Sequence, residues 1–208
     1  MGVTRAGRQT FKSDRVIAFS DGVIAVAITL LVLDLKLPEG VSDAQLGAVL
    51  TDNLHSLGVY VLSFLVVGLL WMGHHEQFSH IRRVDAVLIW LNLFYLMTIG
   101  LIPFTTSLLS DHTTSLSTVL YAGVLVTTSL LSAAMWWHAS RDTALMPADV
   151  PEAVRREGFL STLATGVVFA LSIPIAMVFG ATAGQWSWLL LIPASRIPSL
   201  VERYRSDN

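Results

Sequence analysis

The sequence contains no cysteine and few charged residues. Cysteine is absent from all 208 residues, which excludes disulfides, thiolate metal ligands and a cysteine nucleophile. Only 13% of the residues are charged, about half the share in a soluble domain, whereas 53% are hydrophobic. The formal net charge is −2, so no basic signal for nucleic acid binding is present. This composition is typical of a protein that spans a membrane.

Several segments are apolar and long enough to cross a bilayer, which takes about 20 residues. We predict six spans, at approximately 15–36, 54–73, 84–109, 114–139, 157–180 and 184–201. Pro174 and Pro193 are expected to interrupt the last two. The residues before the first span are polar and basic and lack the apolar stretch of a signal peptide, so this span is expected to stay in the mature protein. The sequence therefore predicts an all-α integral membrane protein with a single domain, residues 1–208.

Lysine and arginine residues gather on one side of these predicted spans. Of the 13 such residues, only Lys36 lies on the other side. The remainder are Arg5, Arg8, Lys12, Arg15, Arg82, Arg83, Arg141, Arg155, Arg156, Arg196, Arg203 and Arg205. Because loops rich in these residues stay in the cytoplasm, we expect both termini there and localisation in the cytoplasmic (inner) membrane.

An ionisable residue lies inside the first span, RVIAFSDGVIAVAITLLVLDL. Asp21 is a short way in from the cytoplasmic end, where a carboxylate costs free energy unless it pairs or meets water. A structural contact with Arg, His or Trp of neighbouring helices is the favoured interpretation. Direct ion binding or proton relay, and an exposed interfacial position, stay open. Gly22 permits either close helix packing or a wide point beside a pore.

The residues around and after Asp21 form an uncharged stripe. Helical steps of three and four place these side chains on one face: Phe19, Gly22, Val26, Thr29, Leu30 and Leu33. The chain has no TVGYG segment, so it encodes no such filter of backbone carbonyls. The stripe fits a pore that selects by an apolar constriction, since an ion must shed water to pass through it.

Two strings resemble a known family. Arg15-x-x-x-Phe19-Ser20-Asp21-Gly22, followed by VIAVAITLLVLDL, is similar to the first helix of the transmembrane protein 175 family, which are potassium channels of bacteria, archaea and lysosomes. The segment WMGHHEQFSHIRRVDAVLIWLNLFYLMTIGLIPFTTSLL (71–109) resembles the bacterial branch. The resemblance implies a homotetramer of six-helix subunits whose first helices line a central pore.

The resemblance also implies which residues do the work. The pore and selectivity residues are Val26, Thr29, Leu30 and Leu33, with Val26 where the family usually has the larger Ile or Leu. A structural polar network is carried over to Arg15, Phe19, Ser20, Asp21, Trp71, His74, His75, Asp85 and Asn92, with Trp90 as a further candidate partner. The implied conducted ion is K⁺, with monovalent cations and membrane lipid as partners and no cofactor or nucleic acid.

The group His74-His75-Glu76 has other interpretations. Imidazoles and a carboxylate are good metal ligands, but adjacent His residues point in different directions and are not the i, i+4 pair of HExxH. A structural role is favoured, while pH sensing and a metal site stay open. A secondary transporter or proton-coupled carrier that uses Asp21 and this group is the alternative function. No nucleophile elbow or zinc protease motif is present, so we do not expect an enzyme.

Four tryptophans and one proline lie near the ends of predicted spans. Trp136, Trp137, Trp186 and Trp188 are expected in interfacial aromatic belts. Pro103 is expected to kink the third span near its external end.

Overall fold

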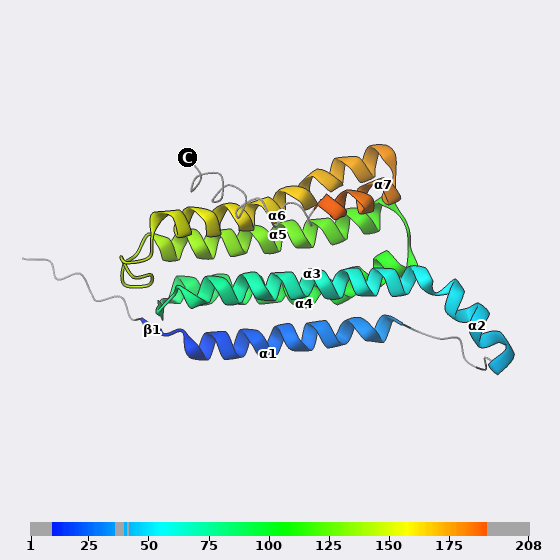
Figure 1. The fold of residues 1–208 in the computed structure, drawn as a ribbon, viewed down its shortest axis with the longest axis horizontal. Coiled ribbons are helices and arrows are strands. Elements are labelled where there is room, and N and C mark those ends of the chain that lie inside the picture. The colour runs from blue at the N-terminus through cyan, green and yellow to red at the C-terminus, as the bar shows by residue number, and fades with distance from the viewer. Residues whose placement is uncertain (1–9, 36–39, 41, 191–208) are drawn as a thin grey trace, which may run out of the picture.

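The structure is a computed structural model that describes residues 10–35, 40 and 42–190 (Figure 1). In these ranges the chain is almost entirely helical. The elements are β1 (Phe11–Lys12), α1 (Asp14–Leu30), η1 (Leu31–Asp34), α2 (Asp43–Asp52), α3 (Leu54–Ser79), β2 (Arg83–Val84), α4 (Ala86–Asp111), α5 (Ser115–Ser140), α6 (Glu152–Phe179), α7 (Ala181–Trp186) and η2 (Ser187–Leu190). Among the described residues, five segments are long and apolar enough to cross a membrane: Asp14–Leu33, Leu54–Ser79, Ala86–Asp111, Ser115–Ser140 and Glu152–Phe179.

The first five predicted spans each coincide with one of these segments. The second is longer than predicted, because α3 continues to Ser79 and carries the His74-His75-Glu76 group on the same helix. The sixth predicted span, 184–201, begins within α7 and η2, and its part from residue 191 lies outside the described residues. The predicted interruption at Pro174 is wrong, since α6 runs through it as one helix. Membrane helices tolerate proline where neighbouring groups satisfy the freed backbone carbonyl.

The long helices lie side by side in two layers (Figure 1). α1, α3 and α4 form one layer, and α5, α6 and α7 form the other. α5 joins the layers, because it packs extensively against both α4 and α6. The chain reverses at Gly180, whose φ of 91° favours glycine, and α7 returns along α6. α1 therefore lies at the edge of the bundle, where it contacts only α3, α4 and η1 extensively among the described elements.

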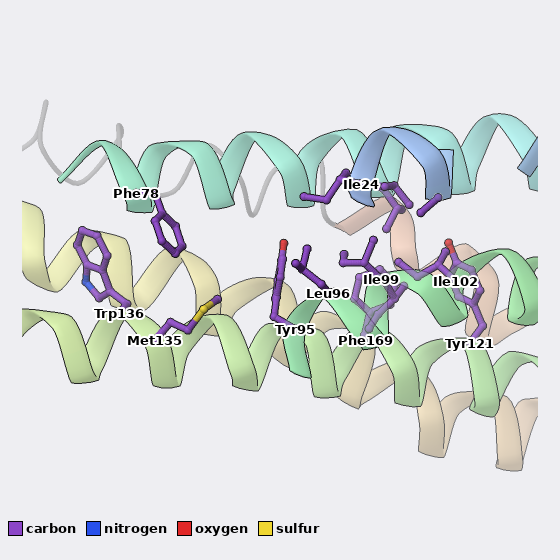
Figure 2. Close-up of a cluster of buried hydrophobic side chains, with 14 of the residues drawn as sticks. Ile24, Phe78, Tyr95, Leu96, Ile99, Ile102, Tyr121, Met135, Trp136 and Phe169 are labelled. Atoms are coloured by element: carbon purple, nitrogen blue, oxygen red, sulfur yellow. The ribbon is translucent and has the colours of Figure 1, made fainter. Parts of the chain in front are cut away.

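The core is a continuous column of buried side chains along the bundle. Figure 2 shows this column from Phe78 and Trp136 at one end to Ile102 and Tyr121 at the other. Lipid tails are as apolar as these side chains, so close packing and hydrogen bonds, more than burial itself, hold membrane helices together. Hydroxyl pairs supply such bonds here. Thr128 Oγ1 donates to Thr98 Oγ1 at 2.9 Å between α5 and α4, and Thr106 Oγ1 donates to Ser63 Oγ at 2.9 Å between α4 and α3.

A short antiparallel pair joins the start of α1 to the turn between α3 and α4. Phe11 pairs with Val84 and Lys12 with Arg83. This pair was not predicted, because strands of two residues carry no periodic signal in the sequence. It fixes the end of α1 that precedes Ser20 and Asp21.

The connection near 37–53 contains a helix that was not predicted. α2 begins with a capping box, in which Ser42 and Gln45 bond reciprocally, with Ser42 Oγ 2.8 Å from Gln45 Oε1. The spacing of Ser42 and Gln45 is the sequence signal that could have found it. α2 extends beyond the ends of the long helices (Figure 1).

The predicted aromatic belts are partly wrong. Trp136 and Trp188 are each only 2% exposed. Trp136 Nε1 donates to the Arg155 carbonyl at 2.6 Å, which explains why this indole lies inside the bundle. Trp188 lies against Tyr121 and Phe169. Trp137 and Trp186 are exposed.

Gly158 of α6 lies directly against the indole ring of Trp136 on α5. A Cβ added there would lie 2.6 Å from Trp136 Cζ2, and the hydrogen bond of this indole prevents it from moving away freely. We expect Gly158→Ala to lower the free energy of unfolding by about 1–3 kcal/mol, as overpacking does. The measurement is the melting temperature of the purified protein in detergent.

Gly123→Ala on α5 is the matched control. A Cβ at Gly123 meets nothing within 4 Å, so this variant should melt at the same temperature or higher, because alanine favours helix over glycine. Equal melting temperatures for the two variants would contradict the close contact between α5 and α6.

Candidate functional site

α1 has a buried face and an exposed face. Its buried side chains are Ser20, Ile24 and Ala27, and Leu31 continues this face into η1. On the opposite face, Val26 is 58% exposed, Leu30 43% and Leu33 65%. Exposed Thr29 lies among them, and its hydroxyl donates to the Val26 carbonyl at 2.8 Å.

The residues predicted to line a pore thus share one uncharged face. Phe19 and Gly22 extend this face toward the start of the helix and are also exposed. We call Val26, Thr29, Leu30 and Leu33 the exposed stripe. No described element of the chain packs over it extensively, since α1 contacts α3 and α4 with its buried face.

A buried chain of hydrogen bonds connects α1 to α4 and α3. Asn92 Nδ2 donates to Ser20 Oγ at 2.9 Å, and Asn92 Oδ1 lies 2.8 Å from His74 Nε2. An amide oxygen can only accept a hydrogen bond, so His74 Nε2 carries the proton and donates it to Asn92 Oδ1. Ser20 Oγ in turn donates to the Val16 carbonyl at 2.8 Å. These three side chains are buried, so a single amide fixes the rotation of α1 relative to both neighbours.

The ring of His74 is held between two aromatic rings. Its centroid lies 4.4 Å from that of Phe78 and 5.3 Å from that of Tyr95, and both pairs are stacked. Tyr95 is itself fixed, because its hydroxyl donates to the Leu70 carbonyl at 3.0 Å. The imidazole therefore has one orientation in which its Nε2 reaches Asn92.

Asp21 makes a separate contact at the surface of the bundle. Trp71 Nε1 donates to Asp21 Oδ1 at 2.9 Å, which joins α3 to α1 next to the buried chain. The His75 ring lies 5.9 Å from that of Trp71. The carboxylate, costly in a spanning segment, thus has a hydrogen-bond donor from the neighbouring helix.

The structure brings together only part of the predicted polar network. Ser20, Asn92 and His74 form one chain, and Asp21 and Trp71 form a second contact. The exposed side chains Arg15, Phe19, His75 and Trp90 form no hydrogen bond with either group within the part of the chain that the structure describes.

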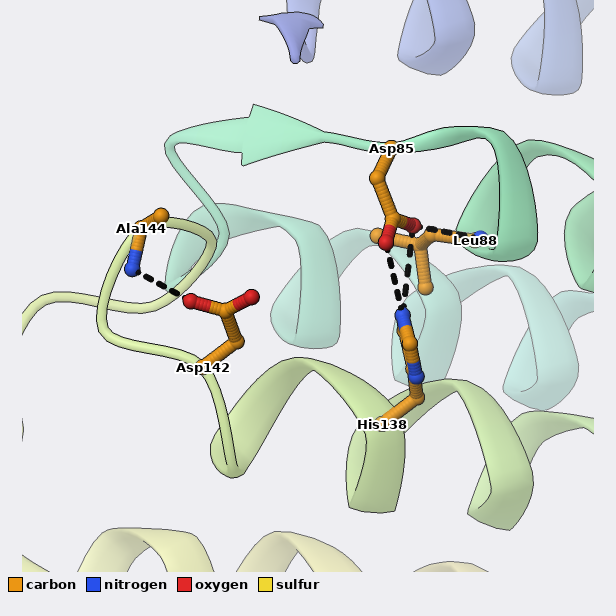
Figure 3. Close-up of polar contacts among 5 residues, drawn as sticks. All are labelled: Asp85, Leu88, His138, Asp142 and Ala144. Atoms are coloured by element: carbon orange, nitrogen blue, oxygen red, sulfur yellow. Dashed lines mark hydrogen bonds and ion pairs between the residues drawn. The ribbon is translucent and has the colours of Figure 1, made fainter. Parts of the chain in front are cut away.

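Asp85 was predicted in this network, but the structure places it elsewhere. It caps the start of α4, where Asp85 Oδ1 accepts from the Leu88 N–H at 2.9 Å (Figure 3). Its other carboxylate oxygen lies 3.0 Å from His138 Nε2 of α5. At a rise of about 1.5 Å per residue, Asp85 and Asn92 lie about 10 Å apart along the axis of α4. At this distance the two side chains do not share hydrogen-bond partners. The contact between Asp85 and His138 was not predicted, because no sequence spacing links them.

The His74-His75-Glu76 group does not converge on one point. His74 is buried against Asn92, whereas His75 is exposed beside Trp71. Glu76 Oε1 lies 3.2 Å from Nε2 of His80, the residue that follows the end of α3. Consecutive residues on a helix point about 100° apart, which accounts for the three different surroundings.

The fold and this helix define a multi-pass, all-helical membrane protein with an uncharged exposed face on its first helix. The family described as endosomal/lysosomal potassium channel TMEM175 matches residues 15–103. A potassium channel of Streptomyces collinus is 36% identical over 172 residues, which are 80% of this chain and 84% of that protein. The chain therefore belongs to the TMEM175 family, a family of channels, not enzymes, as the resemblance implied.

A solved structure agrees with this assignment. The crystal structure of a lysosomal potassium-selective channel TMEM175 homolog from Chamaesiphon minutus is similar with a TM-score of 0.65 at 28% identity, over 89% of this chain and 97% of that one. The endosomal/lysosomal proton channel TMEM175 of Bos taurus is 38% identical over 104 residues. That match covers 46% of this chain and only 22% of the bovine protein.

The bond between Asn92 and Ser20 can be tested by a double-mutant cycle. Asn92→Leu removes the acceptor of His74 and the donor to Ser20, so we expect it to lower the free energy of unfolding by about 1–3 kcal/mol. Ser20→Ala should cost less, and the double variant should cost less than the sum of the two, with a coupling energy of about 0.5 kcal/mol or more. Thermal unfolding in detergent gives all three values. Additive effects would contradict the bond.

Proposed function

We propose that this chain is a potassium-permeable channel of the cytoplasmic membrane, in which the exposed stripe of α1 lines a pore at the axis of a homotetramer. The family and the relatives named potassium channels support K⁺ as the conducted ion. The proposed subunit has six spans, of which the sixth is the span predicted from the sequence at 184–201, and the distribution of Lys and Arg favours both termini in the cytoplasm.

The observation that carries this proposal is the position of the exposed stripe. α1 lies at the edge of the bundle and is fastened through the face opposite to the stripe (Figure 1). Subunits arranged around an axis can therefore bring the stripes of their first helices together without rearranging the bundle. The family resemblance implies the same residues as pore positions, which supports the proposal.

Selectivity in such a pore comes from the cost of removing water. Val26, Leu30 and Leu33 offer no group that replaces the hydration shell of an ion, so a narrow ring of them favours the cation that loses water more readily. K⁺ holds its water less tightly than Na⁺. Thr29 donates its hydroxyl proton to the Val26 carbonyl, which leaves the lone pairs of its oxygen for a passing cation.

Asp21 and Ser20 have a positioning role in this proposal. Their contacts lead to Trp71 and Asn92, which lie on neighbouring helices of the same subunit. These contacts fix the rotation of α1 and with it the direction in which the stripe points. The conducted ion meets the apolar residues and Thr29 instead.

Potassium flux and a variant of the stripe test the proposal. Purified protein in liposomes should pass K⁺ down its gradient, and planar bilayers should show unit currents. Leu30→Ala widens the proposed constriction, so we expect larger unit currents and a smaller preference for K⁺ over Na⁺. Val32→Ala is the control, because Val32 is exposed but lies off the stripe. Absence of K⁺ flux in the unmodified protein would overturn the channel function.

A proton-coupled carrier that uses Asp21 and the His74-His75-Glu76 group is the second candidate, and the observation that favours it is an ionisable carboxylate inside a segment long and apolar enough to span the membrane. Asp21→Asn keeps an oxygen that accepts from Trp71 but cannot take up a proton in the same way. If Asp21 has a positioning role, unit K⁺ currents persist in this variant. Saturable flux that is linked to proton movement and abolished by Asp21→Asn would establish the carrier instead.

A further inference from the structure

A short ribbon of two strands lies at the end of the bundle where α1 begins (Figure 1). It consists of β1 and β2, in which Lys12 is paired with Arg83. One membrane span begins at Asp14 and another at Ala86, so each strand ends directly before a span. The ribbon therefore lies at the boundary between the spans and the solvent at this end of the bundle.

Lys12 and Arg83 lie at the depth of the lipid headgroups. An extended chain rises about 3.3 Å per residue, which places Lys12 within about 7 Å of the first span and Arg83 within about 10 Å of α4. The headgroup layer extends about 5–8 Å beyond the hydrocarbon core on each side of a bilayer. Because long basic side chains near span ends reach toward this layer, both cations meet the phosphate groups of phospholipids.

The ribbon sets two positive charges directly opposite each other. Paired residues of antiparallel strands point to the same face and have Cβ atoms about 4.5–5.5 Å apart, and like charges in this position oppose the pairing. The Lys12 and Arg83 side chains are exposed, and neither forms an ion pair or a hydrogen bond with any residue that the structure describes. The ribbon thus holds a pair of cations whose repulsion the described residues do not offset.

The neighbouring carboxylates do not neutralise this pair. Asp14 is exposed at the start of α1 and forms no ion pair with Lys12. Asp85 is buried, where it accepts from the Leu88 N–H at 2.9 Å and lies 3.0 Å from His138 Nε2. An anion that offsets the repulsion therefore comes from outside the described part of the chain.

Apolar side chains are exposed next to the cations. Phe11 precedes Lys12 in β1 and is 53% exposed. On the membrane side of the ribbon, the first turns of α4 expose Val87 and Trp90. A ligand that binds at the ribbon thus finds positive charge at the boundary and apolar surface toward the membrane.

The charge, the depth and the apolar surroundings favour one kind of ligand. A phosphodiester carries a full negative charge and accepts charge-assisted hydrogen bonds from Lys and Arg. We propose that the ribbon binds the headgroup of an anionic phospholipid, whose phosphate lies between Lys12 and Arg83 and whose acyl chains lie in the adjacent membrane. The bound phosphate offsets the repulsion and stabilises the ribbon, which fixes the start of α1. Binding does not depend on ion conduction, so its test is separate from that of the proposed function.

Lipid titration of the full chain in detergent, followed by native mass spectrometry, tests the site. The anionic probe is phosphatidylglycerol, and the zwitterionic probe is phosphatidylcholine. We expect tighter binding of phosphatidylglycerol, with a preference that falls as the salt concentration rises. Lys12→Gln and Arg83→Gln should each weaken it about fivefold, the usual effect of one cation at an anionic membrane surface, and the double variant should lose the preference.

Arg156→Gln is the matched control. Arg156 is an exposed arginine at the same end of the bundle, near the start of α6, but it lies outside the ribbon (Figure 1). This variant should keep the preference for phosphatidylglycerol. Equal affinities for the two lipids in the unmodified protein, or equal losses in Arg156→Gln and Arg83→Gln, would overturn the proposal. Displacement of phosphatidylglycerol by inorganic phosphate at the same concentration would also overturn it, because the site would then take a free anion.

The melting temperature is a second measurement, and it separates binding from folding. Without added lipid, Lys12→Gln should melt at the same temperature as the unmodified protein or higher, because it removes the like charge opposite Arg83. Phosphatidylglycerol should raise the melting temperature of the unmodified protein more than that of the variant. A variant that gains as much from phosphatidylglycerol as the unmodified protein would contradict a site at this pair.

Discussion

The Asn92 side chain is the contact on which the arrangement of the first layer depends. The amide nitrogen donates a hydrogen bond to Ser20 of α1, and the amide oxygen accepts one from His74 of α3. In an apolar environment these groups are costly to bury unless they bond to one another. Both bonds form only when α1, α3 and α4 have one rotation and one depth. Apolar packing alone would tolerate small rotations of α1 that this contact does not.

The rotation of α1 determines what the helix presents outside the bundle. With Ser20, Ile24, Ala27 and Leu31 turned inward, the stripe from Val26 to Leu33 is left exposed. The polar contact between Trp71 and Asp21 lies at the side of the helix and supports the same orientation. The polar residues thus hold the helix, and the proposed contact with ions is left to uncharged side chains.

The two layers are held together in a different way. Between α4 and α5, hydroxyl pairs such as Thr98 and Thr128 supply the polar contacts. Between α5 and α6, glycines at 158 and 166 let the backbones approach Trp136 and Ser129. Where α3 faces α6, Gln77 Nε2 donates to Thr162 Oγ1 at 3.3 Å, and a cavity remains beside this contact.

Much of the fold could be predicted from the sequence. Long apolar segments specify membrane helices because every backbone polar group must be satisfied within the segment. Five of the predicted spans therefore coincide with helices of the structure. The two faces of α1 follow from helical periodicity, and the family resemblance identified Ser20, Asp21, Trp71, His74 and Asn92 as polar partners. What the sequence by itself determined was the identity of the helices and the kinds of residues on each face. Only the tertiary structure decided that Asp85 pairs with His138, that Trp136 and Trp188 are buried, and that Lys12 lies opposite Arg83. These contacts join residues far apart in the chain, and periodicity within one helix holds no information about which neighbour will lie opposite.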